Sequence, residues 1–229
     1  MNSTKTGYIR EQFYTAAKDY LYLLENGYPV KSIVKLVGDR YELSSAERVL
    51  LYRGLIKKEK LSVRSKMKCR DIPKHSKLYI DGFNVIRTIG SYLNGNFVFR
   101  SMDGFLRDVS ELHRKALKRE VLERSLRLVL DYLEKFFPRE VIFYFDKPVS
   151  HSGKTTQFAN TEIKNRNLNG GAFMVFSPDR ELKNVVNGII CTADSAIIES
   201  AKVPVFDLPS AVLTDRFSPA IFSLYDIFS

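Results

Sequence analysis

The sequence predicts an α/β protein in which a three-layer domain with a parallel sheet follows a small all-α helical domain. Three observations support this prediction. Apolar residues recur at helical spacing through residues 7–61, apolar β-rich runs alternate with helical segments after residue 77, and a basic stretch without periodicity separates the two regions. We therefore expect a helical, helix-turn-helix-like domain at 1–62, a basic linker at 63–76 and an α/β domain at 77–229.

The composition suits a folded protein that binds a polyanion. With 229 residues, of which 45% are hydrophobic, the chain can bury a large core. Its formal net charge of +10 attracts polyanions, of which nucleic acid is the commonest. Most of the surplus lies in residues 1–70, which hold 15 Lys and Arg against 7 Asp and Glu. The alternative is a basic protein whose charge serves solubility alone.

Several classes of protein are disfavoured by what the sequence lacks. Cys69 and Cys191 belong to no CxxC pair or Cys/His cluster, so a structural zinc site is not expected. The polar N-terminus lacks the apolar stretch of a signal peptide, and no apolar run approaches the length of a membrane span. We therefore expect a soluble, cytoplasmic protein that does not associate with membranes.

The N-terminal region predicts three short helices with tight turns. The first carries apolar residues at helical spacing from Tyr14 to Leu24 and stops at Asn26-Gly27, and the second begins near Pro29. Ser44 or Ser45 can cap the third. Such a trio fits either a helix-turn-helix reader of DNA or a plain helical bundle. The basic linker that follows is either a solvated connection or a clamp on backbone phosphates.

The rest of the chain alternates strands with helices. The stretch KLYID (77–81) reads as a buried strand, and Asn94-Gly95 indicates a hairpin turn. The sequence from Asp103 leads into a helical region, and the apolar tail 218–229 is expected to dock on the α/β core. The remaining elements expected are helices at 120–137, 180–187 and 195–201, and strands at 141–145, 172–176, 188–191 and 203–206.

An aspartate closely follows each of the first four core strands. These residues are Asp81, Asp146, Asp179 and Asp194. In a parallel sheet the carboxyl ends of the strands share one edge, where ligands bind, so the four carboxylates are expected to converge. The alternative is that aspartate is simply a favoured turn and cap residue, as Asp194 could be for the helix after it.

Converging carboxylates predict a particular chemistry. They repel one another and stay charged only if cations enter the site. Oxygen-only ligation suits Mg²⁺ or Mn²⁺, and such an ion promotes hydrolysis of phosphodiester bonds. Other phosphate and acyl-transfer sites are disfavoured, since the sequence has no GxGxxG after the first strand, no GxxxxGK[ST] and no GxSxG.

The order YIDGFNV, FDKP, SPD and TAD resembles a PIN-like (NYN-type) nuclease domain from Lys77 to the C-terminus. The resemblance implies that Asp81 with Asn84, and Asp146, Asp179 and Asp194, hold divalent metal ions. In such domains an acidic residue from a helix usually completes the site. Here Asp103 and Asp108 are the candidates for that role.

Most of the chain also resembles the proteins of domain of unknown function family 434. The residues that carry this resemblance are GYPVKS (27–32), KLVGDRY (35–41), LYRG (51–54), DGFNV (81–85), DGFLRDVS (103–110) and DKPVSHSG (146–153). It implies a shared fold and brings no established activity.

The stretch after Asp146 offers groups that suit a phosphate. Ser150 and Ser152 supply hydroxyls and Lys154 supplies a cation. The alternative is a polar loop with no ligand. His151 lies in the same stretch, and we assign it no catalytic role.

Together these features predict a Mg²⁺- or Mn²⁺-dependent nuclease that acts on RNA in preference to DNA. The basic N-terminal helices would hold the strand. Asp81, Asp146 and Asp194 would ligate metal, Asp179 would complete the shell, and Asn84 would orient Asp81 or the substrate. One alternative is a nucleic-acid-binding protein on the same scaffold that does not cut; another is a helical interaction module fused to a nucleotide-binding domain. The oligomeric state is left open.

Overall fold

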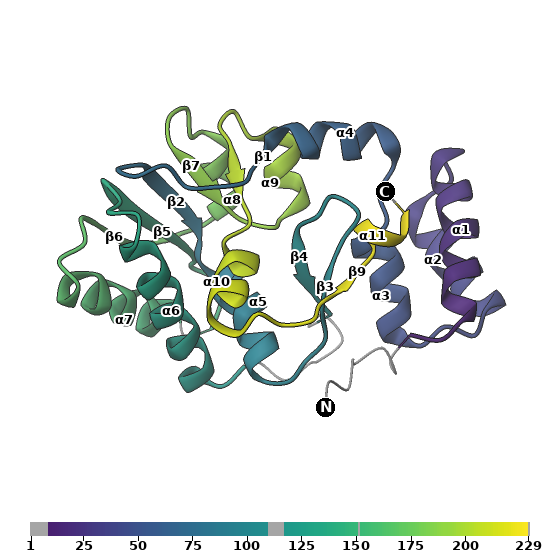
Figure 1. Cartoon of the computed structure of the whole chain (residues 1–229), viewed down its shortest axis with the longest axis horizontal. Coiled ribbons are helices and arrows are strands. Elements are labelled where there is room, and N and C mark those ends of the chain that lie inside the picture. The colour runs from purple at the N-terminus through teal and green to yellow at the C-terminus, as the bar shows by residue number, and fades with distance from the viewer. Residues whose placement is uncertain (1–8, 110–116, 151, 229) are drawn as a thin grey trace. The chain divides into compact units, whose positions relative to one another are not determined.

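The computed structural model describes residues 9–109, 117–150 and 152–228, and the chain forms two compact units (Figure 1). Unit 1 comprises Met1–Ser65, Asn96–Ala116 and Ala220–Ser229; unit 2 comprises Lys66–Gly95 and Leu117–Pro219. The units therefore alternate along the chain, whereas the sequence suggested two domains in succession. The predicted α/β class and the N-terminal helical region are both confirmed.

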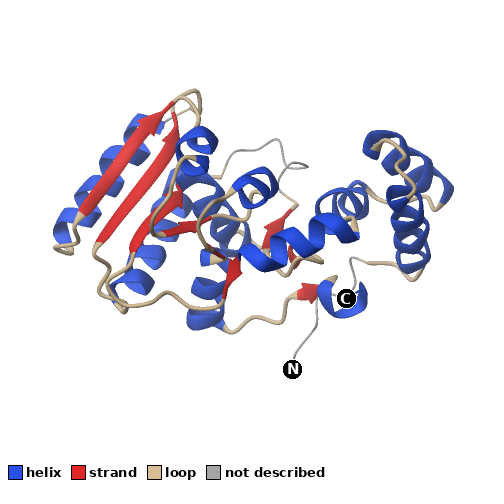
Figure 2. Cartoon of the chain, turned by 90° about the horizontal axis from the view of Figure 1, so that it is seen from above, coloured by secondary structure: helices blue, strands red, loops and turns tan. Residues whose placement is uncertain are grey.

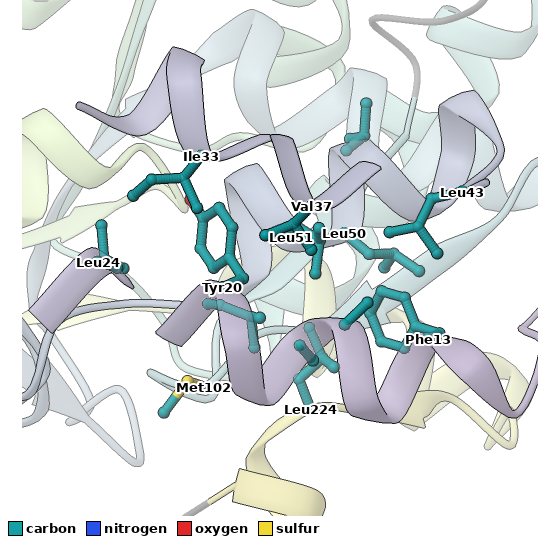
Figure 3. Close-up of a cluster of buried hydrophobic side chains, with 14 of the residues drawn as sticks. Phe13, Tyr20, Leu24, Ile33, Val37, Leu43, Leu50, Leu51, Met102 and Leu224 are labelled. Carbon is teal, nitrogen blue, oxygen red and sulfur yellow. The ribbon is translucent and has the colours of Figure 1, made fainter. Parts of the chain in front are cut away.

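Three N-terminal helices of unit 1 surround a shared apolar core. They are α1 (Gln12–Glu25), α2 (Val30–Arg40) and α3 (Ser45–Gly54). Helix α4 (Lys58–Met67) follows them and crosses the boundary between unit 1 and unit 2. Figure 3 shows side chains of the first three, such as Phe13, Val37 and Leu50, meeting in one cluster. The periodicity of the sequence predicted the inner faces of α2 and α3, whereas at the start of α1 the structure buries Phe13 and exposes Tyr14, with which the predicted face began. Burial of these apolar faces is the main stabilising term for such short helices.

Two segments expected in the α/β domain belong instead to unit 1. Strands β3 (Val98–Arg100) and β4 (Leu106–Asp108) form an antiparallel hairpin, and β9 (Phe222–Ser223) adds to β3 in parallel, followed by α11 (Tyr225–Phe228). Met102 and Leu224 lie in the same buried cluster as the N-terminal helices (Figure 3). The prediction that the tail docks on the α/β core was therefore wrong, since an apolar segment does not reveal which core buries it.

Two local predictions also differ from the structure. The region expected as a linker holds the end of α4 and strand β1 (Lys68–Cys69). The Asn94-Gly95 pair makes no hairpin turn, because it ends helix α5 (Gly82–Leu93), and Gly95 takes a φ of +76° there. An Asn-Gly pair suits either role, since both need a residue that tolerates positive φ.

Unit 2 is built on a six-stranded, fully parallel sheet with strand order β1-β8-β7-β2-β5-β6. Its other strands are β2 (Lys77–Asp81), β5 (Glu140–Asp146), β6 (Gly170–Val175), β7 (Ile189–Cys191) and β8 (Val205–Phe206). Its helices besides α5 are α6 (Arg119–Glu134), α7 (Ser152–Asn165), α8 (Pro178–Lys183), α9 (Ser195–Ser200) and α10 (Leu208–Phe217). Figure 2 shows helices on both sides of these strands.

The path of the chain through the sheet creates a switch point beside the central strand β2. The chain runs outward from β2 through β5 to β6, returns past β2 to β7, and runs outward the other way to β8. Helices α5, α6, α7 and α10 pack against one another, and α8 packs with α9. In open parallel sheets the crevice at such a switch point lies outside the carboxyl ends of the strands. The end of β2 is therefore the place to look for a site.

Within the described ranges, no helix combines the length and the apolar composition that crossing a membrane requires.

The structure decides which serine caps α3, and this carries a testable prediction. The Ser44 hydroxyl accepts a hydrogen bond from the Glu47 N–H, and the Glu47 carboxylate accepts one from the Ser44 N–H. We expect Ser44→Ala to lower the free energy of unfolding by about 1 kcal/mol. Urea unfolding followed by circular dichroism measures it. Ser45→Ala is the control, and an equal loss in both variants would contradict the assignment of the cap.

Candidate functional site

Asp81 occupies the centre of the carboxyl edge of the sheet. It is the last residue of β2, is buried, and directly precedes α5. In the sheet register Asp81 lies opposite Tyr144 of β5, and Ile80 lies opposite Cys191 of β7. The residues that follow β5 and β7 therefore flank the Asp81 carboxylate on its two sides.

A chain of hydrogen bonds joins Asp81 to the turn after β7. The Thr192 hydroxyl donates to Asp81 Oδ2 at 2.9 Å, and the Asp194 N–H donates to the Thr192 hydroxyl at 3.0 Å. Asp194 Oδ1 accepts the N–H groups of Ala196 and Ile197 and so caps α9. The cap considered from the sequence is present, and it holds Asp194 at the same edge as Asp81.

Asn84 braces this turn in a way that the sequence did not indicate. Its side-chain Oδ1 accepts the Ala193 N–H at 2.9 Å, across the junction between α5 and the β7–α9 turn. The Asn84 amide therefore fixes the position of the loop that carries Asp194, and the side-chain hydrogen bond that orients Asp81 comes from Thr192.

The four aspartates share one electrostatic environment. Burial raises the pKa of Asp81 to about 7, and the charges of Asp194 and Asp146 contribute to the increase. The pKa of Asp179 is also raised, first by burial and then by Asp194 and Asp146, although Lys183 at 3.9 Å offsets part of the effect. The charges of Asp146 and Asp194 therefore act on both Asp81 and Asp179, and the convergence of all four side chains on one metal site stays a prediction.

The donor set at this edge fits a hydrated hard cation. All four side chains offer oxygen alone, which suits Mg²⁺ or Mn²⁺. Among the residues that the structure describes, no three His, Cys, Asp or Glu side chains are grouped so that they could hold a metal ion. Mg²⁺ does not need such a cage, because it keeps several water ligands and binds through one or two carboxylates together with substrate phosphates. The chemistry of the residues is compatible with this kind of ion.

Asp103 and Asp108 belong to unit 1, whereas the four strand-end aspartates belong to unit 2. Asp103 is bonded to Arg107 and Arg64, and Asp108 accepts hydrogen bonds from Arg53. A helical region was expected to follow Asp103, but residues 106–108 form strand β4, which ends at Asp108. Residues 110–116 lie outside the described ranges. Both carboxylates are held by arginines within unit 1.

In the stretch expected as a loop, residues 147–150 form a turn and helix α7 begins at Ser152. Ser152 starts α7 and is buried, and its hydroxyl donates to the Lys147 carbonyl oxygen at 3.2 Å and contacts Met174 Sδ. It therefore holds the start of the helix to the sheet. Ser150 and Lys154 are exposed. His151 lies outside the described residues.

Three further residues at this edge escaped the sequence-based prediction. Lys147 follows Asp146 directly, and its Nζ lies 4.5 Å from the centre of the exposed Phe176 ring. Asp207 follows β8 at the same edge, but it caps α10 and lies 3.9 Å from Lys68. A rule that examined every residue directly following a strand would have found all three.

A cavity of about 370 Å³ lies at the opposite edge of the sheet. Its lining includes Lys77, Arg139, Gly188 and Pro204, each at or just before the start of a strand. None of the four strand-end aspartates lines this cavity.

Comparison with known proteins shows that the chain matches family models that describe no activity. Residues 12–66 match the model of the protein of unknown function DUF434, and residues 70–211 match the domain of unknown function DUF5616. The expected resemblance to family 434 is thus confirmed for the N-terminal region. The chain is 32% identical over 190 residues to the uncharacterized protein MJ0935 of Methanocaldococcus jannaschii, which covers 82% of this chain and 89% of that protein. No solved structure matches. The chain therefore belongs to the family of proteins that carry the DUF5616 domain.

Proposed function

We propose that the protein is a metal-dependent nuclease with a PIN-like domain of the NYN type. It would hydrolyse phosphodiester bonds, in RNA in preference to DNA, with Mg²⁺ or Mn²⁺ as cofactor. The observation that carries the proposal is the buried carboxylate of Asp81 at the switch point of the sheet, which the Thr192 hydroxyl joins to the turn that carries Asp194.

The residues at the edge have distinct roles in this proposal. Asp81, Asp146 and Asp194 would supply oxygen ligands, and Asp179 would complete the shell. Thr192 positions Asp81 through its hydroxyl, and Asn84 fixes the turn that carries Asp194. A bound divalent ion would lower the pKa of a water molecule and neutralise charge on the scissile phosphate.

The charge of the chain supports a polyanionic substrate. The net charge is +10, and α1 and α2 expose Lys18, Lys31 and Lys35 to solvent. Such side chains bind phosphates without regard to sequence and make binding depend on salt. In the proposal these helices hold the strand, and Ser150 and Lys154, both exposed, contact phosphates beyond Asp146.

A second candidate is a nucleic-acid-binding protein on the same scaffold that does not cleave. One observation favours it: in the described part of the chain, no three carboxylates are grouped as a ready metal site. The positive charge would serve binding in either case, so only a cleavage assay separates the two candidates.

The test is cleavage of end-labelled single-stranded RNA and DNA with Mn²⁺, with Mg²⁺ and with EDTA. Wild type is compared with Asp81→Asn and with Asp194→Asn, since asparagine also caps helices and so preserves the start of α9. Asp215→Asn, which alters a partly exposed ion pair with Lys135, is the control.

We expect metal-dependent cleavage by wild type and by the control, and a loss of at least about 100-fold in both site variants. Cleavage that persists in EDTA or in Asp81→Asn would overturn the proposal. Salt-sensitive binding without any cleavage would instead support the second candidate.

A further inference from the structure

Phe176 is an aromatic side chain that the fold leaves in solvent. Its exposed fraction is 79%, although it directly follows the apolar strand β6. Asp146 pairs with Val175 in the sheet, and the Lys147 N–H continues that pairing by donating to the Val175 carbonyl oxygen at 2.8 Å. Lys147 and Phe176 are thus neighbours at the end of the β5–β6 pair, with the ammonium 4.5 Å from the ring centre.

This pair sits between two of the clustered carboxylates. Lys147 comes directly after Asp146, and Phe176 precedes Asp179 by three residues. The Ser177 hydroxyl caps α8 by accepting the Arg180 N–H, so the chain turns immediately after Phe176. The backbone that carries Phe176 therefore ends its strand at the same edge of the sheet as Asp146.

The surroundings of Phe176 differ from those of the neighbouring exposed aromatic residue. Phe173, which is 51% exposed, lies beside the ring of Tyr144. For Phe176 the ring contact found among the described residues is a cation. A ring and an ammonium side by side offer one face for a base and one charge for a phosphate, which are the two components of a nucleotide.

We propose that Phe176 and Lys147 form a platform that binds one nucleotide of a single-stranded nucleic acid at the rim of the carboxylate site. The inference rests on the proposed function, and it adds the substrate class. In a duplex both faces of an internal base are already stacked, so only an unpaired base can reach the ring. The site is therefore expected to act on unpaired segments.

The test measures binding in EDTA, so that no cleavage can interfere. A fluorescent single-stranded RNA, the DNA of the same sequence and the corresponding RNA duplex are titrated with each variant. We expect Phe176→Ala to weaken binding of both single strands by about 5- to 100-fold. Phe176→Trp should keep or improve it, and duplex binding should not change.

Phe137 provides a matched control. It is 63% exposed, and Lys74 Nζ lies 5.8 Å from its ring centre, so it has the same kind of cation contact. It precedes β5, and so lies at the opposite edge of the same sheet. Phe137→Ala should leave the affinity for single strands unchanged.

The role of Lys147 is tested by measuring how binding affinity depends on salt concentration. A lysine that contacts a phosphate releases about one counterion, so Lys147→Gln should reduce the slope of log affinity against log salt by about one. Its effect should be similar for every single-stranded sequence.

Unchanged single-strand binding in Phe176→Ala, an equal loss in Phe137→Ala, or no binding by wild type would each overturn the platform. Failure of the nuclease proposal would look different. If Phe176→Ala weakens binding while wild type does not cleave with Mn²⁺, the platform stands and the nuclease does not. If wild type cleaves and Phe176→Ala changes neither binding nor kcat/KM, the nuclease stands and the platform falls.

Discussion

Replacing Asp103 with asparagine is expected to lower the free energy of unfolding by about 3–5 kcal/mol. The Asp103 carboxylate is fully buried and accepts bonds from Arg107 at 2.7 and 2.8 Å and from Arg64 at 3.0 Å. It also accepts the Phe105 N–H and the Ser101 hydroxyl. Asparagine would leave two buried guanidinium groups without this negative charge, and the loss is a large part of the stability of a typical protein.

The pKa of Asp103 reflects two opposing effects, burial of the carboxyl group and its contacts with arginines. Burial alone would raise this pKa, but the charge and hydrogen bonds of Arg107, with those of Ser101 and Arg64, hold it well below its usual range. A lowered pKa stabilises the folded state at pH values above the ordinary pKa near 4, and this contribution is lost as the pH falls toward the folded value. Wild type should therefore lose its advantage over Asp103→Asn only in strong acid.

Urea unfolding at pH 7 measures the effect. Asp39→Asn is the control in the same unit, because Asp39 also pairs with an arginine, Arg48, but is 59% exposed. An exposed pair contributes at most about 1 kcal/mol. Equal midpoints for Asp103→Asn and wild type would show that the buried pair carries no stability.

Replacing Asp81 with asparagine is expected to stabilise the protein at pH 8 in the absence of divalent ions. The folded-state pKa of about 7 lies above the ordinary value near 4, so the folded protein binds this proton more tightly than the unfolded chain does. The contribution of Asp81 to stability is therefore greatest below about pH 4, declines as the pH rises to 7, and stays low above it. Asparagine resembles the neutral acid and avoids this decline, which amounts to as much as about 4 kcal/mol.

Thermal unfolding from pH 4 to 8 in EDTA checks this prediction. The Tm of Asp81→Asn should exceed that of wild type at pH 8, and the difference should shrink toward pH 4. Asp215→Asn, at a partly exposed ion pair with Lys135, should follow wild type throughout. A Tm for Asp81→Asn below that of wild type at pH 8 would contradict the raised pKa.

Divalent ions give the same variant a second readout. If Asp81 ligates Mn²⁺, millimolar Mn²⁺ should raise the Tm of wild type at pH 8, because a ligand that binds the folded state alone stabilises it. Asp81→Asn should respond much less. An equal response of the two proteins would place any bound ion elsewhere.

The sequence alone determined the fold class and most of the main elements, and it supplied the hypothesis of an acidic site. Apolar spacing gave the helices of unit 1 and the strands of unit 2, because periodicity reports directly which side of an element is buried. One rule of parallel sheets places the four strand-end aspartates at the same edge, and their joint action on a metal ion stays a prediction.

What the sequence left undecided depends on partners far away in the chain. The apolar tail was recognisable as buried, but only the fold places Leu224 in the same buried cluster as Phe13. Thr192 bonds Asp81 across 111 positions of sequence, and Asn84 reaches Ala193 across 109, which no local pattern could have indicated. Local periodicity shows which face of an element is apolar. Long-range packing determines which other element covers that face, and it also determines the pKa of a buried carboxylate. Only the tertiary structure defines this packing.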